Sequence, residues 1–236
     1  MKPRQRVQLL LQFSIGVGLI SAGCTLLPSN NLPSSGSASP TAAESPEDSP
    51  TASALPTISS NQERPDTRIV PMTIEGEVLE MELALFDEQP LPFTTYVPTK
   101  DFQHEVASSD QGTVAQFFFS PTGKKDETAY LQIFIPARTT SIDDMRELLL
   151  NNQGLLAANS WQLVDRTDIV SYPWAREKLI YQQQLEKQNF VGSIYIGDHE
   201  GQAFYALTHY PSEYVDGFEP RSTIMLENLQ FRDEMP

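Results

Sequence analysis

Few residues in this 236-residue chain have both the type and the spacing that catalysis or metal binding requires. The three histidines, at positions 104, 199 and 209, are far apart, and no two have the i and i+4 spacing of helical metal ligands. His199 lies between Asp198 and Glu200, and this trio could contribute to a divalent-ion site. A solvated turn explains the same three residues. We therefore predict no metal site, with Asp198, His199 and Glu200 as the weak candidates.

Two pairs of acidic residues have a spacing that general acid–base chemistry could use. These pairs are Glu80 with Glu82 and Asp143 with Asp144. We interpret the first pair as the solvated face of a strand and the second as favourable charge at the start of a helix. No G-x-S-x-G, Walker or G-x-G-x-x-G motif is present. The sequence therefore predicts no catalytic residue and no cofactor.

The two tryptophans, Trp161 and Trp174, are the candidates for the wall of a ligand pocket. Large aromatic side chains are more often part of a hydrophobic core, and we take core packing as the main interpretation. Trp161 and Trp174 stay weak candidates for a ligand-binding role.

The single cysteine, Cys24, follows a segment with the layout of a secretory leader. Three basic residues among the first six precede an apolar stretch at 7–20, and small residues in "LISAGC" precede the thiol. The apolar stretch is short for a transmembrane helix. An uncleaved anchor helix with an incidental cysteine is the alternative interpretation. No second cysteine is present to form an internal disulfide.

This layout resembles the bacterial lipoprotein signal, although Ser21 stands where leucine is usual. The resemblance implies that residues 1–23 are a cleaved signal peptide. It also implies that Cys24 carries a diacylglycerol and an acylated amino terminus. Two or more acyl chains hold a protein stably on a bilayer, so we expect a membrane anchor at Cys24.

Residues 24–66 differ in composition from the rest of the chain. Ser, Pro, Ala and Thr dominate, as in "SSGSASPTAAESPEDSPTASALP", and large apolar residues are too sparse to offset the entropy of ordering. We expect a disordered stalk that holds the following domain away from the membrane. Removal of the leader leaves 13 basic and 31 acidic residues, a net charge of −18. This negative charge argues against nucleic acid as a partner. It also argues against electrostatic binding to anionic lipid, so we expect membrane attachment through the lipid on Cys24.

Residues 67–236 are long enough for one well-buried core and are expected to form one domain. The predicted strands span 73–86, 93–97, 102–108, 113–119, 129–135, 175–185, 190–196 and 202–209. Within the first strand the alternation changes phase near Val78, which predicts a bulge or bend. The polar segment 197–201, "GDHEG", is expected to be a hairpin turn.

Two helices complete the predicted elements. Ser141 and Asp144 have the spacing of a capping box, an apolar stripe follows (Ile142, Met145, Leu148 and Leu149), and Gly154 is the expected stop. A second helix is expected from 213 or 220 to 230, with Met225 and Leu229 facing inward. Strands, a helix, more strands and a final helix predict an α+β domain: an antiparallel sheet with helices packed on it.

Several segments resemble the PsbP-like proteins. They are "FTTYVPTKDF", the hairpin "SIYIGDHEGQAFYALTHYP" and the final helix "IMLENLQF", although Phe102 stands where tryptophan is common. The resemblance implies an α/β/α sandwich, which also occurs in DcrB-like periplasmic lipoproteins and in a nuclear Ran-binding import factor. Members of this fold act mostly as accessory and binding proteins, some of them at photosystem II.

We therefore expect a membrane-anchored, non-enzymatic accessory lipoprotein that binds a protein partner at the membrane surface. One alternative is a module that binds a small molecule or lipid in a pocket beside Trp161 and Trp174. A second alternative is an envelope hydrolase with an unrecognised site. The expected location is the bacterial envelope, facing the periplasm, the cell exterior or, in a cyanobacterium, the thylakoid lumen.

Overall fold

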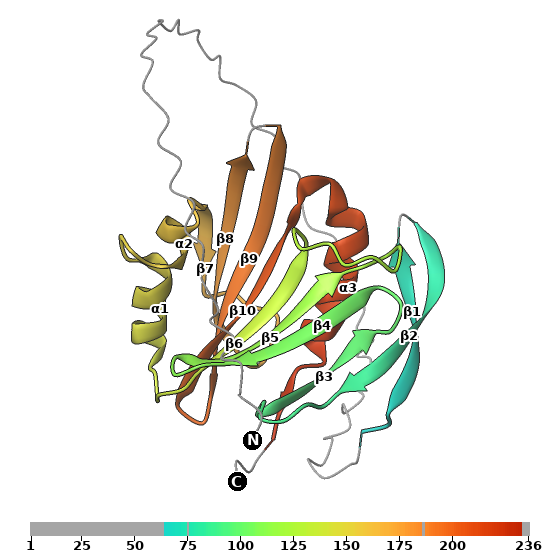
Figure 1. Ribbon diagram of the computed structural model, residues 1–236, viewed down its shortest axis with the longest axis horizontal. Coiled ribbons are helices and arrows are strands. Elements are labelled where there is room, and N and C mark those ends of the chain that lie inside the picture. The colour runs from blue at the N-terminus through green and yellow to red at the C-terminus, as the bar shows by residue number, and fades with distance from the viewer. Residues whose placement is uncertain (1–63, 75, 186, 233–236) are drawn as a thin grey trace, which may run out of the picture. The chain divides into compact units, whose positions relative to one another are not determined.

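The computed structural model describes residues 64–74, 76–185 and 187–232, which form an α+β domain as predicted (Figure 1). The expected signal peptide and Cys24 lie outside the described residues, as does the expected stalk up to residue 63. Within the described residues, no helix is long and apolar enough to cross a bilayer.

Two antiparallel sheets make up the framework of the domain. The large sheet has seven strands in the order β4-β5-β6-β10-β9-β8-β7, and the small sheet has four in the order β1-β2-β3-β11. The strands of the large sheet are β4 (Phe102–Ser108), β5 (Gly112–Phe119), β6 (Tyr130–Pro136), β7 (Gln162–Thr167), β8 (Ala175–Leu185), β9 (Gln188–His199) and β10 (Gln202–Pro211). Those of the small sheet are β1 (Thr67–Ile74), β2 (Glu77–Phe86), β3 (Phe93–Pro98) and β11 (Gln230–Phe231).

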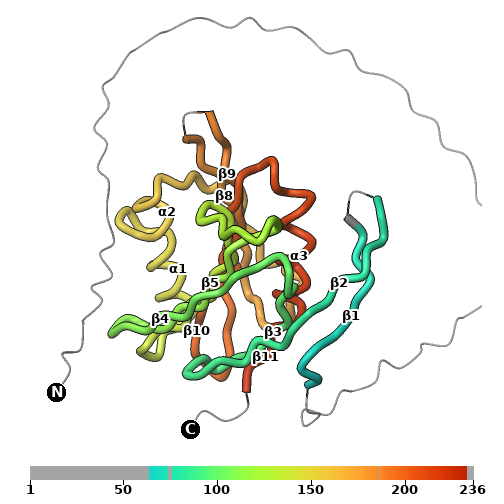
Figure 2. The backbone as a smooth tube through the Cα atoms, turned by 45° about the vertical axis from the view of Figure 1, so that its right-hand side comes forward, coloured from blue at the N-terminus to red at the C-terminus, as the bar shows by residue number. Residues whose placement is uncertain are grey.

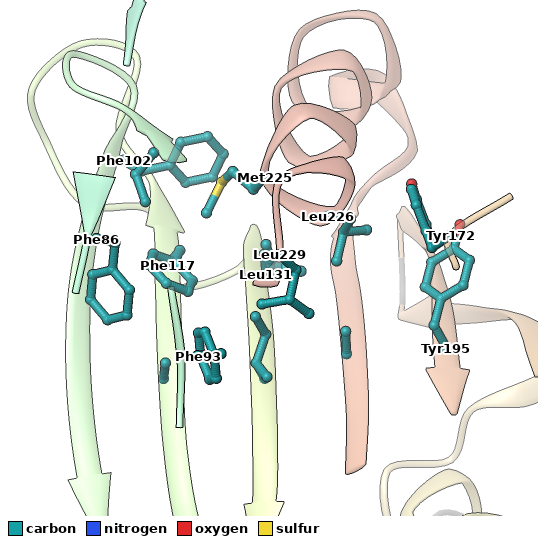
Figure 3. Packing of buried hydrophobic residues seen from close by; sticks show 14 of the residues in the cluster. Phe86, Phe93, Phe102, Phe117, Leu131, Tyr172, Tyr195, Met225, Leu226 and Leu229 are labelled. Atoms are coloured by element: carbon teal, nitrogen blue, oxygen red, sulfur yellow. The ribbon is translucent and has the colours of Figure 1, made fainter. Parts of the chain in front are cut away.

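Helices cover both faces of the large sheet, which agrees with the apolar residues on both faces at the centres of β5 and β6. Helices α1 (Ile142–Leu150) and α2 (Leu155–Ala158) lie on one face, and α3 (Val215–Glu227) lies on the other (Figure 2). One core cluster joins α1 and α2 to the sheet through Met145, Leu149 and Leu156. The other joins α3 and β3 to the opposite face, and Figure 3 shows Leu226 and Leu229 within it.

The first predicted helix is confirmed, with one difference at its end. Ser141 and Asp144 form the predicted capping box, with both reciprocal hydrogen bonds present. The helix ends at Leu150 because Asn151 is already extended, and Gly154 instead precedes α2. Leu148 of the predicted apolar stripe is exposed.

The predicted strand at 73–86 is wrong. The chain instead makes a hairpin in which β1 pairs with β2, and Gly76, with φ +84°, lies in the turn. The phase change near Val78 therefore marks a reversal of the chain and not a bulge, because β1 and β2 pair without a register shift from Thr67–Ala84 to Ile74–Glu77. The register instead shifts in β7, between Leu163 and Asp165, and in β8, between Ala175 and Glu177.

In the second half of the chain, one strand was not predicted, and the boundaries of two other elements differ from expectation. Strand β7, an exposed edge strand, was not predicted. Strand β9 continues to His199, so the reversal that was expected over 197–201 is confined to Glu200 and Gly201. The last helix begins at Val215, after a short 3-10 turn (Ser212–Tyr214), and Met225 and Leu229 are both buried as predicted.

The described part of the domain begins at Arg64, which is bound to the small sheet. The Arg64 guanidinium lies 4.5 Å from the centre of the Tyr96 ring. It also donates hydrogen bonds to the Thr94 hydroxyl at 2.6 Å and to the Asn228 carbonyl at 3.0 Å. These contacts join the start of the domain to β3 and to the end of α3.

Candidate functional site

A cleft of about 370 Å³ lies where the small sheet meets the edge strand β4 of the large sheet. We call it the β4 cleft. It is lined by residues from the end of β2 and the loop after it, from the end of β3, and from β4: Ala84, Leu85, Phe86, Asp87, Glu88, Val97, Pro98, Thr99, Phe102 and His104. The backbone turns tightly between β3 and β4, where the Asp101 amide donates to the Pro98 carbonyl, yet the two strands belong to different sheets.

One wall of the β4 cleft is apolar, and the core behind it holds its side chains in place. The Phe86 ring packs edge-on against His104, with 5.0 Å between ring centres. It also packs edge-on against Phe117 at 4.9 Å, and Figure 3 shows these two rings side by side. Phe102 and Val97 are buried in the same cluster. Because these side chains are fixed by the core behind them, the apolar wall is preorganised and does not have to form when a ligand binds.

The charged groups of the cleft are two carboxylates and one imidazole. His104 Nε2 lies 2.7 Å from Glu88 Oε1, and both side chains are about half exposed. Asp87 is paired with Arg232. Arg232 also donates to the Leu91 carbonyl at 2.8 Å, so the end of the described chain fixes the loop that carries both carboxylates.

The His104–Glu88 pair combines an imidazole with a carboxylate, as a general base does, and the groups around it decide which chemistry it can support. An imidazole oriented by a carboxylate becomes a general base only when it also contacts a nucleophile or a bound water. Within the described residues, His104 has no hydrogen bond to a hydroxyl or thiol. The arrangement can bind a polar or cationic group.

A second hollow, of about 400 Å³, lies between Thr73 of β1 and the first turns of α3. It is wide and open, and its lining includes Asp216, Glu219 and Pro220 but no aromatic ring. We prefer the β4 cleft as the candidate site because its apolar rings and convergent polar groups are what small binding sites combine.

The structure places the weak metal candidates at the end of β9 and in the following turn. The His199 ring stacks on Phe231 at 4.6 Å, and Asp198 is opposite Ala203 in the β9–β10 pair. Over residues 64–74, 76–185 and 187–232, no group of three or more His, Cys, Asp or Glu side chains could hold a metal ion.

The structure does not bring Trp161 and Trp174 together. Trp161 stacks on Tyr181 at 4.3 Å, in the core beneath α1 and α2. Trp174 stacks on Tyr172 at 5.2 Å, and its indole donates to the Leu226 carbonyl in the core beneath α3. The two indoles therefore lie on opposite faces of the large sheet, and each packs in a different core cluster.

The remaining histidine, His209, is buried among aromatic rings. Trp161 and Phe190 stack on it, each at 5.0 Å. Tyr181 Oη lies 3.1 Å from its Nδ1 and also donates to the Thr208 carbonyl, so Nδ1 is the donor in the first contact. Burial lowers the pKa of His209 to about 4. The imidazole is thus a neutral core group at pH 7.

The acid pairs lie where the sequence indicated. Glu80 and Glu82 are exposed on β2. Asp143 pairs with Arg146, and hydrogen bonds from Ser141 lower the pKa of Asp144. The sequence did not indicate Phe86, Asp87 or Glu88 as site residues. Glu88 and His104 are sixteen positions apart with no motif spacing, and they meet only because the two sheets pack together.

No family model and no curated protein matches this chain. Among solved structures, it is similar to a crystal structure from Bacteroides thetaiotaomicron VPI-5482, at 17% identity and a TM-score of 0.40, over 64% of this chain and 49% of that one. This chain thus spans about half the length of the Bacteroides protein. It is also similar to the solution structure of cyanobacterial PsbP (CyanoP) from Synechocystis sp. PCC 6803, at 9% identity and a TM-score of 0.41, over 64% of this chain and 92% of that one. Likeness at these identities and TM-scores transfers no function to this chain.

Proposed function

We propose that this protein is a non-enzymatic binding protein, tethered to a membrane through lipid on Cys24, that binds a partner protein at the β4 cleft. One observation carries the proposal. The β4 cleft combines a preorganised aromatic wall with two carboxylates, and it lies beside the unpaired edge of the large sheet. Apolar anchors surrounded by polar groups are what protein interfaces use at their centres.

The properties of the cleft favour binding over catalysis. Phe86 and Phe102 are held by the core, with 4% and 7% of their surface exposed, and line the cleft, while Glu88 on the rim supplies charge. His104, the one imidazole in the lining, is bound to Glu88 and to no nucleophile within the described residues. The volume of about 370 Å³ also falls within the range of small-molecule pockets, about 300–1,000 Å³. A small-molecule or lipid-binding module is therefore the second candidate function.

The experiment is site-specific photo-crosslinking in the full-length, lipid-modified protein. A photoreactive amino acid replaces Thr99, which is exposed on the rim of the β4 cleft, and the control carries it at the exposed Glu147 of α1. After irradiation, membranes are solubilised in detergent and the adducts are identified by mass spectrometry. We expect protein adducts from position 99 that position 147 does not give.

Two results would contradict the proposal. Adducts of the same proteins from both positions would indicate random collision at the membrane. Small-molecule or lipid adducts alone from position 99 would favour the second candidate function.

A further inference from the structure

Strand β4 is an unusually regular sheet edge. Its seven residues pair one to one with β5 from Phe102 to Ser108, without a register shift and without proline. The other edges are interrupted or short. Strand β7 carries a register shift, β1 contains Pro71, and β11 has two residues. Bulges, prolines and short length are the features by which proteins keep exposed edges from pairing. Strand β4 has none of them.

The hydrogen-bond pattern shows which peptide groups of β4 face outward. Phe119, opposite Phe102, directs its amide away from β4 to the Ala129 carbonyl at 2.8 Å. At the other end, the Ser109 amide donates to the Gly112 carbonyl at 2.9 Å and so closes the β4–β5 hairpin. Because hydrogen-bonded and non-bonded pairs alternate in an antiparallel ladder, every second residue of β4 directs its N–H and C=O outward. The outward residues are Phe102, His104, Val106 and Ser108.

These outward groups have no backbone hydrogen bond to β2, β3 or a loop within the described residues. Five of the seven residues of β4 are exposed. The edge therefore presents a row of donors and acceptors that an extended chain could satisfy.

The β4 cleft lies on the side of this edge to which Phe102 and His104 point. Side chains directly opposite each other on paired strands lie on the same face of the sheet. A residue that pairs with Phe102 or His104 from an added strand would therefore place its side chain at the cleft. There it would meet the apolar wall at Phe86 and the half-exposed carboxylate of Glu88, whereas Asp87 is already paired with Arg232.

We propose that β4 accepts an extended segment of a partner protein as an added antiparallel strand, with a lysine or arginine of that segment in the β4 cleft. This inference rests on the proposed function and names the chemistry of the partner. A long basic side chain suits the cleft because its methylenes pack along the apolar wall while its charge reaches the Glu88 carboxylate.

Charge favours this occupant over a second copy of the chain. The mature chain carries a net charge of −18, so two copies repel each other, whereas a basic segment is attracted. Pairing of β4 with β4 of another copy about Glu105 would also set two identical carboxylates opposite each other, which is unfavourable.

The test uses a fluorescently labelled seven-residue peptide. Lysine occupies every second position, and threonine or valine occupies the positions between. A twin peptide carries glutamate in place of lysine. Fluorescence anisotropy should show saturable binding of the lysine peptide to the purified protein and no binding of the glutamate twin. Equal binding of the two peptides, or no binding of the lysine peptide, would overturn the inference.

Two variants then locate the binding. Val106→Pro removes an outward N–H but none of the hydrogen bonds between β4 and β5. Val106→Thr is the matched control, because it keeps the outward N–H. We expect Val106→Pro to weaken binding at least about fivefold, which corresponds to the loss of one hydrogen bond, and Val106→Thr to weaken it less than about twofold. Unchanged affinity in a folded Val106→Pro protein would overturn the inference, as would a concentration-dependent dimer that this variant abolishes.

If Val106→Pro fails to fold, Ser108→Pro with Ser108→Ala repeats the comparison at the next outward residue. Failure here is distinguishable from failure of the proposed function. If position 99 crosslinks to a partner protein but the proline variants have no effect, the proposed function stands and strand addition is rejected.

Discussion

At the scale of single residues, His209 couples the stability of the domain to pH. Burial lowers its pKa to about 4, whereas an unfolded chain binds the same proton at about pH 6.5. Below pH 6.5 the unfolded state therefore gains a proton that the native state lacks, and stability falls as the pH falls from about 6.5 to about 4. His209 should account for a loss of about 2 kcal/mol between pH 7 and pH 5.

The change His209→Phe should remove this part of the pH dependence, because phenylalanine retains ring packing and does not titrate. Urea unfolding at pH 7 and pH 5 measures it. The control is Gln103→Ala, which alters an exposed side chain that does not titrate and should keep the wild-type pH dependence. Equal loss of stability in wild type and His209→Phe between the two pH values would contradict this assignment.

The trio Asp198, His199 and Glu200 leads to a prediction of weak metal binding. The His199 ring is stacked on Phe231, and three neighbouring residues at the end of a strand do not converge on a point. Calorimetric titration with zinc, manganese and calcium should show no site tighter than about millimolar.

His199→Asn should lower the free energy of unfolding by about 0.5–1 kcal/mol through loss of the stack. Asp198→Asn and Glu200→Gln should each change it by less than about 0.5 kcal/mol. A micromolar site that His199→Asn abolishes would overturn the prediction.

At the scale of elements, Glu177 joins α1 and β7 to β8. Its side chain is 6% exposed, and it accepts a hydrogen bond from Arg146 of α1 at 2.9 Å while Arg166 of β7 pairs with its other oxygen. Glu177→Ala should lower the free energy of unfolding by about 2 kcal/mol, less than for a fully buried pair because both arginines are partly exposed. The matched control, Glu147→Ala on the exposed side of α1, should change it by less than about 0.5 kcal/mol. Similar urea midpoints for the two variants would show that the triad does not join these elements.

The elements that the sequence predicts well are those set by local signals. Ser141 and Asp144 lie three residues apart on one turn, so the helix start follows from the sequence alone. The β1–β2 hairpin was missed because Gly76 is the only turn signal there, and apolar residues continue on both sides of it. Strand β7 was missed because all its residues are at least partly exposed, which leaves no alternation to detect.

The candidate site depends on contacts that no local pattern encodes. Glu88 follows β2 and His104 lies in β4, and they are adjacent because the small sheet packs against the large one. Trp161 and Trp174 were expected mainly as core residues, with one pocket beside both of them as the weaker alternative. The strand order separates them, because it sets which face of the sheet each indole reaches.

At the scale of the whole molecule, the proposed function gives the acidic domain and the lipid on Cys24 separate roles. Cleavage of the predicted leader would leave a net charge of −18, which opposes binding to anionic lipid, so we expect membrane attachment to depend on Cys24 alone. Cys24→Ser should yield an unprocessed or released protein, whereas the control Ser21→Leu, which restores the usual residue before the cleavage site, should stay anchored. Cell fractionation and the mass of the amino-terminal peptide measure both outcomes. A Cys24→Ser protein of normal mature size that fractionates entirely with membranes would contradict the lipoprotein interpretation.

The most direct measurement of the central claim is residue-resolved amide hydrogen exchange along β4. In the purified free protein, the outward amides of His104 and Val106 should exchange fast and the inward amides of Gln103, Glu105 and Ala107 slowly, because only the inward ones are bonded to β5. When the crosslinked partner or the lysine peptide is bound, the outward amides should become protected and the alternation should disappear. Outward amides that are already slow in the free protein, or that stay fast in the complex, would contradict the claim that β4 is a free edge used for binding.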